Sequence, residues 1–96
     1  MKIRILDLAI IDLEKGRDFY QAQQLGLGEY FLDSIFADIE SLQLYAGTHQ
    51  QYFGFYRLLA KRFPYAIYYR VTTEIQVWRI LDCRARPHGL SNNGAK

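Results

Sequence analysis

The sequence has few of the residues that stabilise small proteins through covalent or metal links. Its single cysteine, Cys83, cannot form an internal disulfide, and one structural thiol fits a reducing cytoplasm. No Cys and His residues have the spacing of metal ligands, and an isolated histidine such as His49 is rarely part of a metal site. We therefore expect no metal or other cofactor, and we expect His49 to be exposed and without a role.

Long apolar runs and the loops of common catalytic folds are also missing. No segment approaches the length of a membrane span, and Asp7 and Asp12 interrupt what would be a signal-peptide core. Gly26 and Gly28 precede a predicted helix, but they lack the third glycine and the lysine of a phosphate-binding loop. We expect a soluble cytoplasmic protein with no membrane association.

What the sequence does contain is enough apolar surface for one core. Half of its 96 residues are hydrophobic and 16% are aromatic, which suffices for a single domain but not for two. We expect this domain to span residues 1–87. The small and polar residues 88–96 are expected to form a disordered tail.

Charge is divided unevenly along the chain. Residues 1–55 contain four basic and eight acidic residues, whereas residues 56–96 contain eight basic and two acidic ones. This separation indicates an anionic partner for the C-terminal half. A second interpretation stays open, because arginines on a solvated sheet face also keep strand edges from pairing.

The N-terminal half has the periodicity of a short strand and two helices. Residues 2–6 alternate between apolar and polar side chains, and Asp7 is expected to cap the helix that follows. Helices are predicted over about 8–25 and 27–44, separated by glycines that can end a helix.

Apolar residues at spacings of three and four mark the buried side of each helix. They are Ala9, Ile10, Leu13, Phe19 and Tyr20 in the first helix and Phe31, Leu32, Ile35, Ile39 and Leu42 in the second. The acids of the second helix, Asp38 among them, are expected on the solvated side, and Asp12 is expected to favour the first helix dipole. Gly16 indicates either a close helix contact or tolerance of a weak helix former.

The C-terminal half has the composition of three consecutive antiparallel strands, over about 55–61, 64–72 and 75–83, after a connecting loop at 45–55. The last strand has apolar residues on both parities, which indicates cover on both sides or a hydrophobic groove. The predicted class is α+β, in the order strand, helical hairpin and three-stranded antiparallel meander, with the helices packed on one face of the sheet.

Basic and aromatic side chains alternate through the predicted strands. The basic residues are Arg57, Lys61, Arg62, Arg70, Arg79, Arg84 and Arg86, and the aromatic ones are Tyr56, Tyr65, Tyr68, Tyr69 and Trp78. Guanidinium groups bind phosphates and aromatic faces stack on bases, and arginines can also stabilise the transition state of a metal-independent nuclease. For any one residue a core or surface role is the simpler interpretation, but we interpret the group as a binding edge.

The order of elements and four segments resemble the RelE/ParE superfamily of bacterial type II toxins, in particular the ParE-like plasmid stabilisation proteins. The segments are Asp12–Leu13, Phe31–Asp33, Arg62–Val71 and Ile80–Pro87. Together with the intervening elements, the resemblance covers nearly all of residues 3–87.

The resemblance implies a toxin that a cognate antitoxin neutralises by wrapping an extended or helical segment around it. ParE members are described as inhibiting DNA gyrase, whereas RelE-like members cut mRNA at the ribosome. Of five positions that the cleaving branch uses, this chain keeps Arg57 and Arg84 and departs at Leu59, Ala66 and Leu90. The resemblance therefore favours gyrase as the target. A ribosome-dependent endoribonuclease and an inactive toxin retained as an antitoxin partner are the alternatives.

We assign three sets of candidate site residues. The residues expected to contact the target are Arg79, Arg84 and Arg86. Those expected to contact the antitoxin are Phe31, Ile35, Tyr68 and Trp78. If the protein is a nuclease, the resemblance and the basic pattern point to Arg57, Lys61, Arg70, Arg84 and Arg86.

Overall fold

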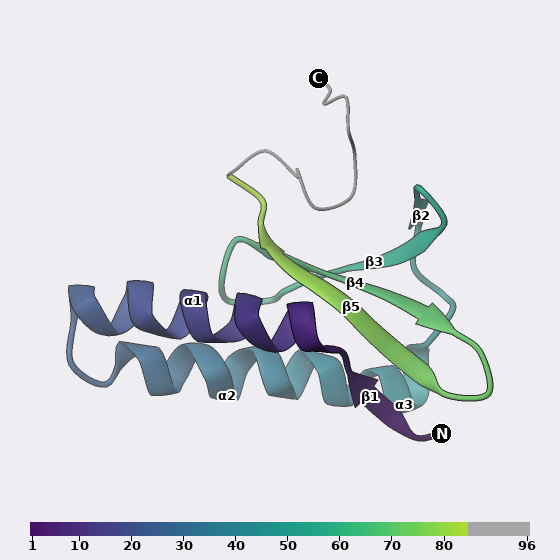
Figure 1. Ribbon diagram of the computed structural model, residues 1–96, viewed down its shortest axis with the longest axis horizontal. Helices are drawn as coiled ribbons and strands as arrows, with labels where there is room; N and C mark the ends of the chain where they lie inside the picture. The colour runs from purple at the N-terminus through teal and green to yellow at the C-terminus, as the bar shows by residue number, and fades with distance from the viewer. Residues whose placement is uncertain (85–96) are drawn as a thin grey trace.

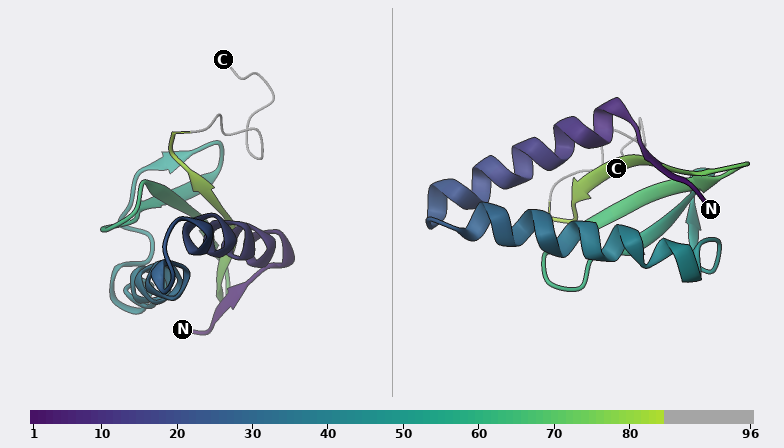
Figure 2. Two further views of the ribbon diagram at one scale, coloured as in Figure 1. Left: turned by 90° about the vertical axis from the view of Figure 1, so that its left-hand side faces the viewer. Right: turned by 90° about the horizontal axis from the view of Figure 1, so that it is seen from below.

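Two helices form a hairpin that covers one face of a five-stranded sheet. The computed structural model describes residues 1–84 (Figure 1). Helix α1 spans Asp7–Gln23 and helix α2 spans Leu27–Glu40, and the two lie side by side in all three views (Figure 2). Arg86 and the predicted tail lie outside the described residues.

The sheet has the strand order β1-β5-β4-β3-β2. Its strands are β1 (Ile3–Ile5), β2 (Gln51–Tyr52), β3 (Phe55–Leu59), β4 (Tyr65–Val71) and β5 (Ile75–Asp82). β1 pairs parallel with β5, and the other neighbours pair antiparallel. The predicted α+β class is confirmed, with its N-terminal strand, its helical hairpin and its antiparallel meander.

Two short elements lie at the end of the predicted second helix and in the predicted connecting loop. The second helix ends at Glu40, and a separate one-turn helix, α3, spans Leu42–Tyr45. Strand β2 then extends the sheet beyond β3. A helix of four residues and a strand of two are too short to show a period in the sequence, which is why they were missed.

The core lies between the helical hairpin and the sheet. Its side chains include Tyr20, Phe31, Ile35, Leu42, Phe63, Tyr65, Ile67, Tyr69, Ile75, Val77 and Ile80. Ile10 and Phe19, which we predicted on the buried side of α1, are 42% and 49% exposed. They lie outside the stripe that α1 turns towards the core, because a surface helix buries only one such stripe.

Gly16 of α1 lies directly against a side chain of α2. A Cβ atom at this position would lie 2.5 Å from Cζ of Phe31, and Phe31 is fully buried. Of the two interpretations of Gly16, the close helix contact is therefore confirmed.

A bulge in β5 explains why its apolar residues fall on both parities. Tyr68 pairs with Arg79, but Tyr69 pairs with Val77, so Trp78 is an extra residue in the ladder. Val77 and Ile80 are three residues apart, yet both belong to the core. The mixed parity thus reflects a change of face within the strand, and of the two interpretations offered for it, cover on both sides is wrong.

Three acidic residues have roles other than those predicted. Asp7 is not the cap of α1, since Leu6 occupies that position and no side-chain hydrogen bond caps the helix. Asp12 and Asp38 are buried. Asp38 is not on the solvated side of α2, because its Oδ2 accepts the Lys61 backbone N–H at 3.1 Å and so satisfies a donor between β3 and β4.

His49 is half-buried and contacts the core, so the prediction that it is exposed and idle is wrong. Its Nδ1 makes a short hydrogen bond with the hydroxyl of Tyr69, a residue with no exposed surface. The Gly47 backbone N–H donates to the same hydroxyl at 3.0 Å. These two contacts fasten the segment after α3 to β4.

Replacement of Gly16 by alanine is expected to destabilise the fold. The added methyl group overlaps the fully buried ring of Phe31, and overpacking of this kind costs about 1–3 kcal/mol. The gain in helix propensity returns about 1 kcal/mol. Chemical denaturation of Gly16→Ala should show a net loss, whereas Glu14→Ala on the exposed side of the same helix should leave stability unchanged within about 0.5 kcal/mol. A stabilised Gly16→Ala variant would contradict the close contact.

Acid is expected to weaken the fold through His49. Burial lowers the pKa of His49 below its ordinary value of 6.5, so the folded state binds fewer protons than the unfolded state. Stability therefore falls as the pH decreases from about 6.5 towards the lower pKa of the folded state. Thermal unfolding of the wild type between about pH 7.5 and 5 should show this loss, and His49→Gln should lack it. Equal pH dependence in both proteins would argue against a role for His49.

Candidate functional site

The outer edge of β5 loses its strand partner halfway along. β1 pairs only with Ile75–Val77, and the last contact is the Leu6 N–H, which donates to the Val77 carbonyl at 2.9 Å. From Trp78 to Asp82 this edge faces α1 instead (Figure 1). A strand edge without a partner leaves backbone donors and acceptors to be satisfied by other groups.

Asp12 projects from α1 onto this edge. Its carboxylate accepts from Nε and Nη2 of Arg79 at 2.8 and 3.0 Å. The same carboxylate accepts the backbone N–H of Ile80 at 2.9 Å. Hydrogen bonding to Asp12 raises the pKa of Arg79 above its ordinary value. One buried acid therefore joins a helix, a strand edge and a cation.

A groove of about 330 Å³ runs between α1 and the end of β5. Lys15, Gly16 and Phe19 line it from the helix, and Tyr65 and Leu81 line it from the sheet. Burial raises the pKa of Tyr65 to about 12, so its hydroxyl keeps its proton at neutral pH. The groove therefore combines an exposed cation with aromatic walls.

Arg84 follows β5 and is held by a carboxylate two residues earlier. Its Nε contacts Oδ1 of Asp82 at 3.0 Å and its Nη2 contacts Oδ2 at 2.8 Å. Nη2 also donates to the Tyr20 hydroxyl at 3.4 Å, and hydrogen bonding from Arg84 lowers the pKa of Asp82. A guanidinium has five N–H donors. The two on Nη1 make no hydrogen bond within residues 1–84, which leaves them available to an anionic partner.

The opposite face of the sheet carries a second group of cations. Cross-strand partners share a face, and the register pairs Tyr52 with Phe55 and Arg57 with Tyr68. The helices lie on the other face (Figure 2). Cζ of Arg57 lies 4.0 Å from the centre of the Tyr52 ring, and Nη2 of Arg57 donates to the Tyr52 hydroxyl at 3.2 Å.

Arg70 lies on the same face between two aromatic rings. Its Cζ is 4.2 Å from the centre of the Phe55 ring and 5.1 Å from that of Trp78. The two rings meet edge to face, with their centres 5.7 Å apart. We call six residues of this face the open-face cluster: Tyr52, Phe55, Arg57, Tyr68, Arg70 and Trp78.

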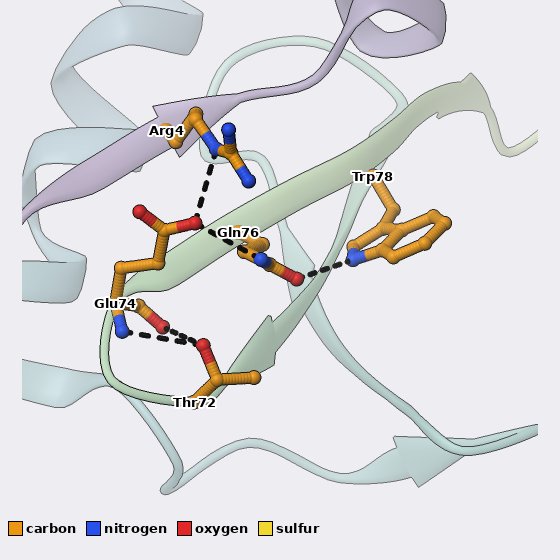
Figure 3. A network of polar contacts seen from close by, with 5 residues as sticks. All are labelled: Arg4, Thr72, Glu74, Gln76 and Trp78. Atoms are coloured by element: carbon orange, nitrogen blue, oxygen red, sulfur yellow. Dashed lines mark hydrogen bonds and ion pairs between the residues drawn. The ribbon is translucent and has the colours of Figure 1, made fainter.

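A chain of polar contacts reaches from β1 to Trp78 (Figure 3). The indole N–H of Trp78 donates to Oε1 of Gln76 at 3.3 Å, and Nε2 of Gln76 donates to Oε2 of Glu74 at 2.9 Å. Arg4 closes the chain with an ion pair of 3.0 Å to the same Glu74 oxygen. These contacts hold the polar edge of the indole.

Comparison with known proteins gives a match among solved structures. No family model and no curated protein sequence matches the chain. A chain of the structure entitled "Chromosomal ParDE TA system from P. aeruginosa" superposes with a TM-score of 0.69 and 27% sequence identity. The match covers 83% of this chain and 92% of that one. This chain is a ParE-like protein.

The structure places the predicted basic residues of this ParE-like protein in three locations. Arg57 and Arg70 lie together in the open-face cluster. Arg79 and Arg84 lie on and after β5, and both are already paired with carboxylates. Lys61 lies between β3 and β4, with its backbone bonded to Asp38 of α2. Of the five residues proposed for a nuclease, the four within the described part of the chain are therefore divided among these locations, and Arg86 lies outside it.

The four residues predicted to contact an antitoxin divide between the two sides of the sheet. Phe31 and Ile35 are fully buried in the core and have no exposed surface. Tyr68 and Trp78 lie on the open face, where Tyr68 is buried and Trp78 is half-buried. On the outside of α2, Tyr30 and Phe36 expose 49% and 44% of their surface.

Sequence reasoning missed Asp12 as a structural centre of this site. The signal was available, because Asp12 falls within the stripe of Ala9, Leu13 and Gly16 that α1 buries. An acid within a buried stripe requires a partner. Tyr52 and Phe55 were missed because they belong to β2 and to the start of β3, in and at the end of the segment predicted as a loop.

Two further findings describe residues 1–84 alone. No group of three or more His, Cys, Asp or Glu side chains lies close enough to hold a metal ion there. No helix in that part of the chain is long and apolar enough to cross a membrane.

A double-mutant cycle on Asp12 and Arg79 is expected to show strong coupling. Their side chains are 7% and 20% exposed, so removal of either one leaves a poorly solvated charge or donor behind. We expect a coupling free energy of about 2 kcal/mol from Asp12→Ala, Arg79→Ala and the double variant in chemical denaturation. The matched pair Arg17 and Asp18, at 43% and 72% exposure, should couple by less than about 0.5 kcal/mol. Similar values for both pairs would contradict the special role of Asp12.

Proposed function

We propose that this chain is the toxin of a type II toxin–antitoxin pair. The observation that carries the proposal is the match to a chain of the P. aeruginosa ParDE system, which extends over most of both chains. The charge separation of the sequence is compatible with a protein that binds an anionic partner. A cognate antitoxin would hold the toxin inactive until it is removed.

The target that we propose is DNA gyrase, bound through the end of β5. Arg84 is exposed there, and Asp82 and Tyr20 fix its orientation. A guanidinium that is already oriented loses less conformational entropy when it binds a carboxylate or phosphate. Arg79 and Arg86 complete the proposed contact set, with Arg79 contributing the part of its guanidinium that Asp12 does not engage.

The antitoxin contact that we propose involves both sides of the domain. Exposed apolar side chains lie on the helices, Tyr30 and Phe36 among them, beside the buried Phe31 and Ile35. Trp78 and Tyr68 lie on the other face of the sheet. A single antitoxin segment can reach both sets only if it passes around the edge of the sheet. This arrangement suits an extended or helical segment that wraps around the toxin.

A ribosome-dependent mRNA endoribonuclease is the second candidate. The observation in its favour is that Arg57 and Arg70 share the open face with no carboxylate partner within residues 1–84. Cys83 lies near Arg57, but burial raises the pKa of its thiol, which makes it a poor general base at neutral pH. We therefore favour a toxin that acts by binding. A third candidate is an inactive toxin that is retained only as an antitoxin partner.

Two assays separate these candidates, one with the purified chain and one on cells in which the chain is induced. A DNA supercoiling assay with the purified chain tests the gyrase target, and unchanged gyrase activity at concentrations that arrest growth would exclude it. Primer extension on cellular mRNA tests the nuclease, because discrete new 5′ ends form only if mRNA is cut. Normal growth with neither effect would indicate the inactive toxin.

Substitution of Arg84 is expected to weaken toxicity without unfolding the protein. Arg84→Ala removes the oriented guanidinium at the end of β5, so growth arrest on induction should be weaker than with the wild type, and gyrase inhibition should decrease in parallel. Arg17→Ala is the matched control, because it removes one charge from the surface of α1. Equal growth arrest by Arg84→Ala and the wild type, at equal protein levels and melting temperatures, would contradict the proposed contact.

A further inference from the structure

The two carboxylates that line the groove between α1 and the end of β5 are already occupied by other groups of the chain. They are those of Asp12 and Asp82. Asp12 accepts from the Arg79 guanidinium and from the Ile80 backbone. Asp82 accepts from the guanidinium and from the backbone N–H of Arg84. Each acid is thus neutralised by its own arginine, and the polar atoms left for a ligand are mainly donors.

Three side chains of the groove offer donors that the described fold does not use. Lys15 takes part in none of the ion pairs within residues 1–84. Arg79 engages Asp12 through Nε and Nη2, which leaves the two N–H groups of Nη1. The Tyr65 side chain is only 7% exposed, yet its hydroxyl makes no hydrogen bond within the same residues. A polar group that is buried to this extent normally has a partner.

Tyr65 supplies its donor at neutral pH. Burial raises the pKa of its hydroxyl to about 12, so the proton is retained. The hydroxyl, the ammonium of Lys15 and the free side of the Arg79 guanidinium all border one groove. A group that accepts hydrogen bonds from all three is an anion, because two of the donors are cations.

Phe19 forms an aromatic wall beside these donors. It lines the groove and is 49% exposed. Its ring meets the Tyr20 ring edge to face, with the centres 5.0 Å apart and an angle of 82° between the planes. This contact orders the ring before a ligand arrives, so less entropy is lost on binding. Leu81 lines the groove from the sheet. The groove therefore combines apolar walls with unused donors.

The size of the groove and the state of the strand edge favour a compact ligand. A strand that paired with this part of β5 would need the Ile80 N–H, and Asp12 already accepts it at 2.9 Å. A peptide therefore cannot extend the sheet here without displacing Asp12. The volume of about 330 Å³ lies at the lower end of the range for small-molecule sites, about 300–1,000 Å³. This space suits a molecule with a single ring.

We propose that the groove between α1 and the end of β5 binds a small organic acid, with its carboxylate on an aromatic or short apolar body. The carboxylate accepts from Lys15, Arg79 and Tyr65. The body packs between Phe19 and Leu81. The inference goes beyond the proposed toxin function, because neither the antitoxin contact nor the gyrase contact involves Lys15, Phe19 or Tyr65.

Amide NMR spectra of the isotope-labelled full chain test this inference with phenylacetate as the probe. The acid is titrated to about 10 mM at constant pH and ionic strength. The Gly16 and Leu81 amide signals should shift with a Kd of about 0.1–1 mM, as expected for a ligand of about ten non-hydrogen atoms. The amides of Gly54 and Arg57, in the β2–β3 hairpin, should not shift. Benzyl alcohol and acetate each carry only one part of the probe, and each should bind at least about tenfold more weakly.

Two variants remove the proposed donors one at a time. Tyr65→Phe removes the hydroxyl and keeps the ring in the core, and Lys15→Met removes the cation from the surface of α1. Each should weaken the binding of phenylacetate about tenfold, as for the loss of one hydrogen bond to a charged group. Tyr52→Phe and Arg17→Met remove the same groups from positions outside the groove, and both should bind as the wild type does. A thermal melt of each variant shows that it is folded.

Four results would overturn the inference. The first is an absence of shifts at Gly16 and Leu81 up to about 10 mM phenylacetate. The second is equal binding of benzyl alcohol and phenylacetate, which would indicate an apolar groove that does not recognise an anion. The third is an equal loss of affinity in Lys15→Met and Arg17→Met, which would indicate net charge alone. The fourth is tighter binding of the blocked dipeptide acetyl-glutamyl-phenylalanine amide, which would assign the groove to a protein partner. Growth arrest is measured independently, so the toxin proposal does not depend on these results.

Discussion

The buried carboxylate of Asp12 is the contact on which the arrangement of this protein depends. It is held by Arg79 and by the Ile80 backbone, at the point where β1 ends and β5 has no strand neighbour. Without an acceptor in that place, the Ile80 N–H would be buried and unsatisfied. The same contact fixes α1 against the bulged half of β5. The contact of Asp12 thereby holds in place the two walls of the groove, α1 and the end of β5, from which the chain continues to Arg84.

Hydrophobic periodicity predicted the long elements of this fold because each of them buries one continuous face. The same reasoning could not find the bulge at Trp78, since one extra residue shifts parity without any change of composition. It also placed Asp38 in solvent, although this residue lies within the buried stripe of α2. Periodicity shows which positions are buried. It does not show whether a backbone N–H group lies within hydrogen-bonding distance of a buried carboxylate.

The candidate functional site could be predicted only in part, because the sequence does not show which charges are paired in the fold. The sequence shows that the C-terminal half is basic, but not which arginines are neutralised by acids from elsewhere in the chain. The fold pairs Arg79 and Arg84 with carboxylates and leaves Arg57 and Arg70 over aromatic rings. It therefore separates two surfaces that look alike in the sequence. One is an oriented edge beside the helices, and the other is a charged aromatic face on the far side of the sheet.

The roles proposed for these surfaces require that this chain is a toxin that a partner neutralises. The most direct measurement is the growth of cells in which the chain is induced alone or together with the reading frame adjacent to its own. Growth should stop when the chain is produced alone and should be restored by the neighbouring gene product, which should copurify with the chain. Normal growth while the folded chain accumulates without that partner would contradict the account.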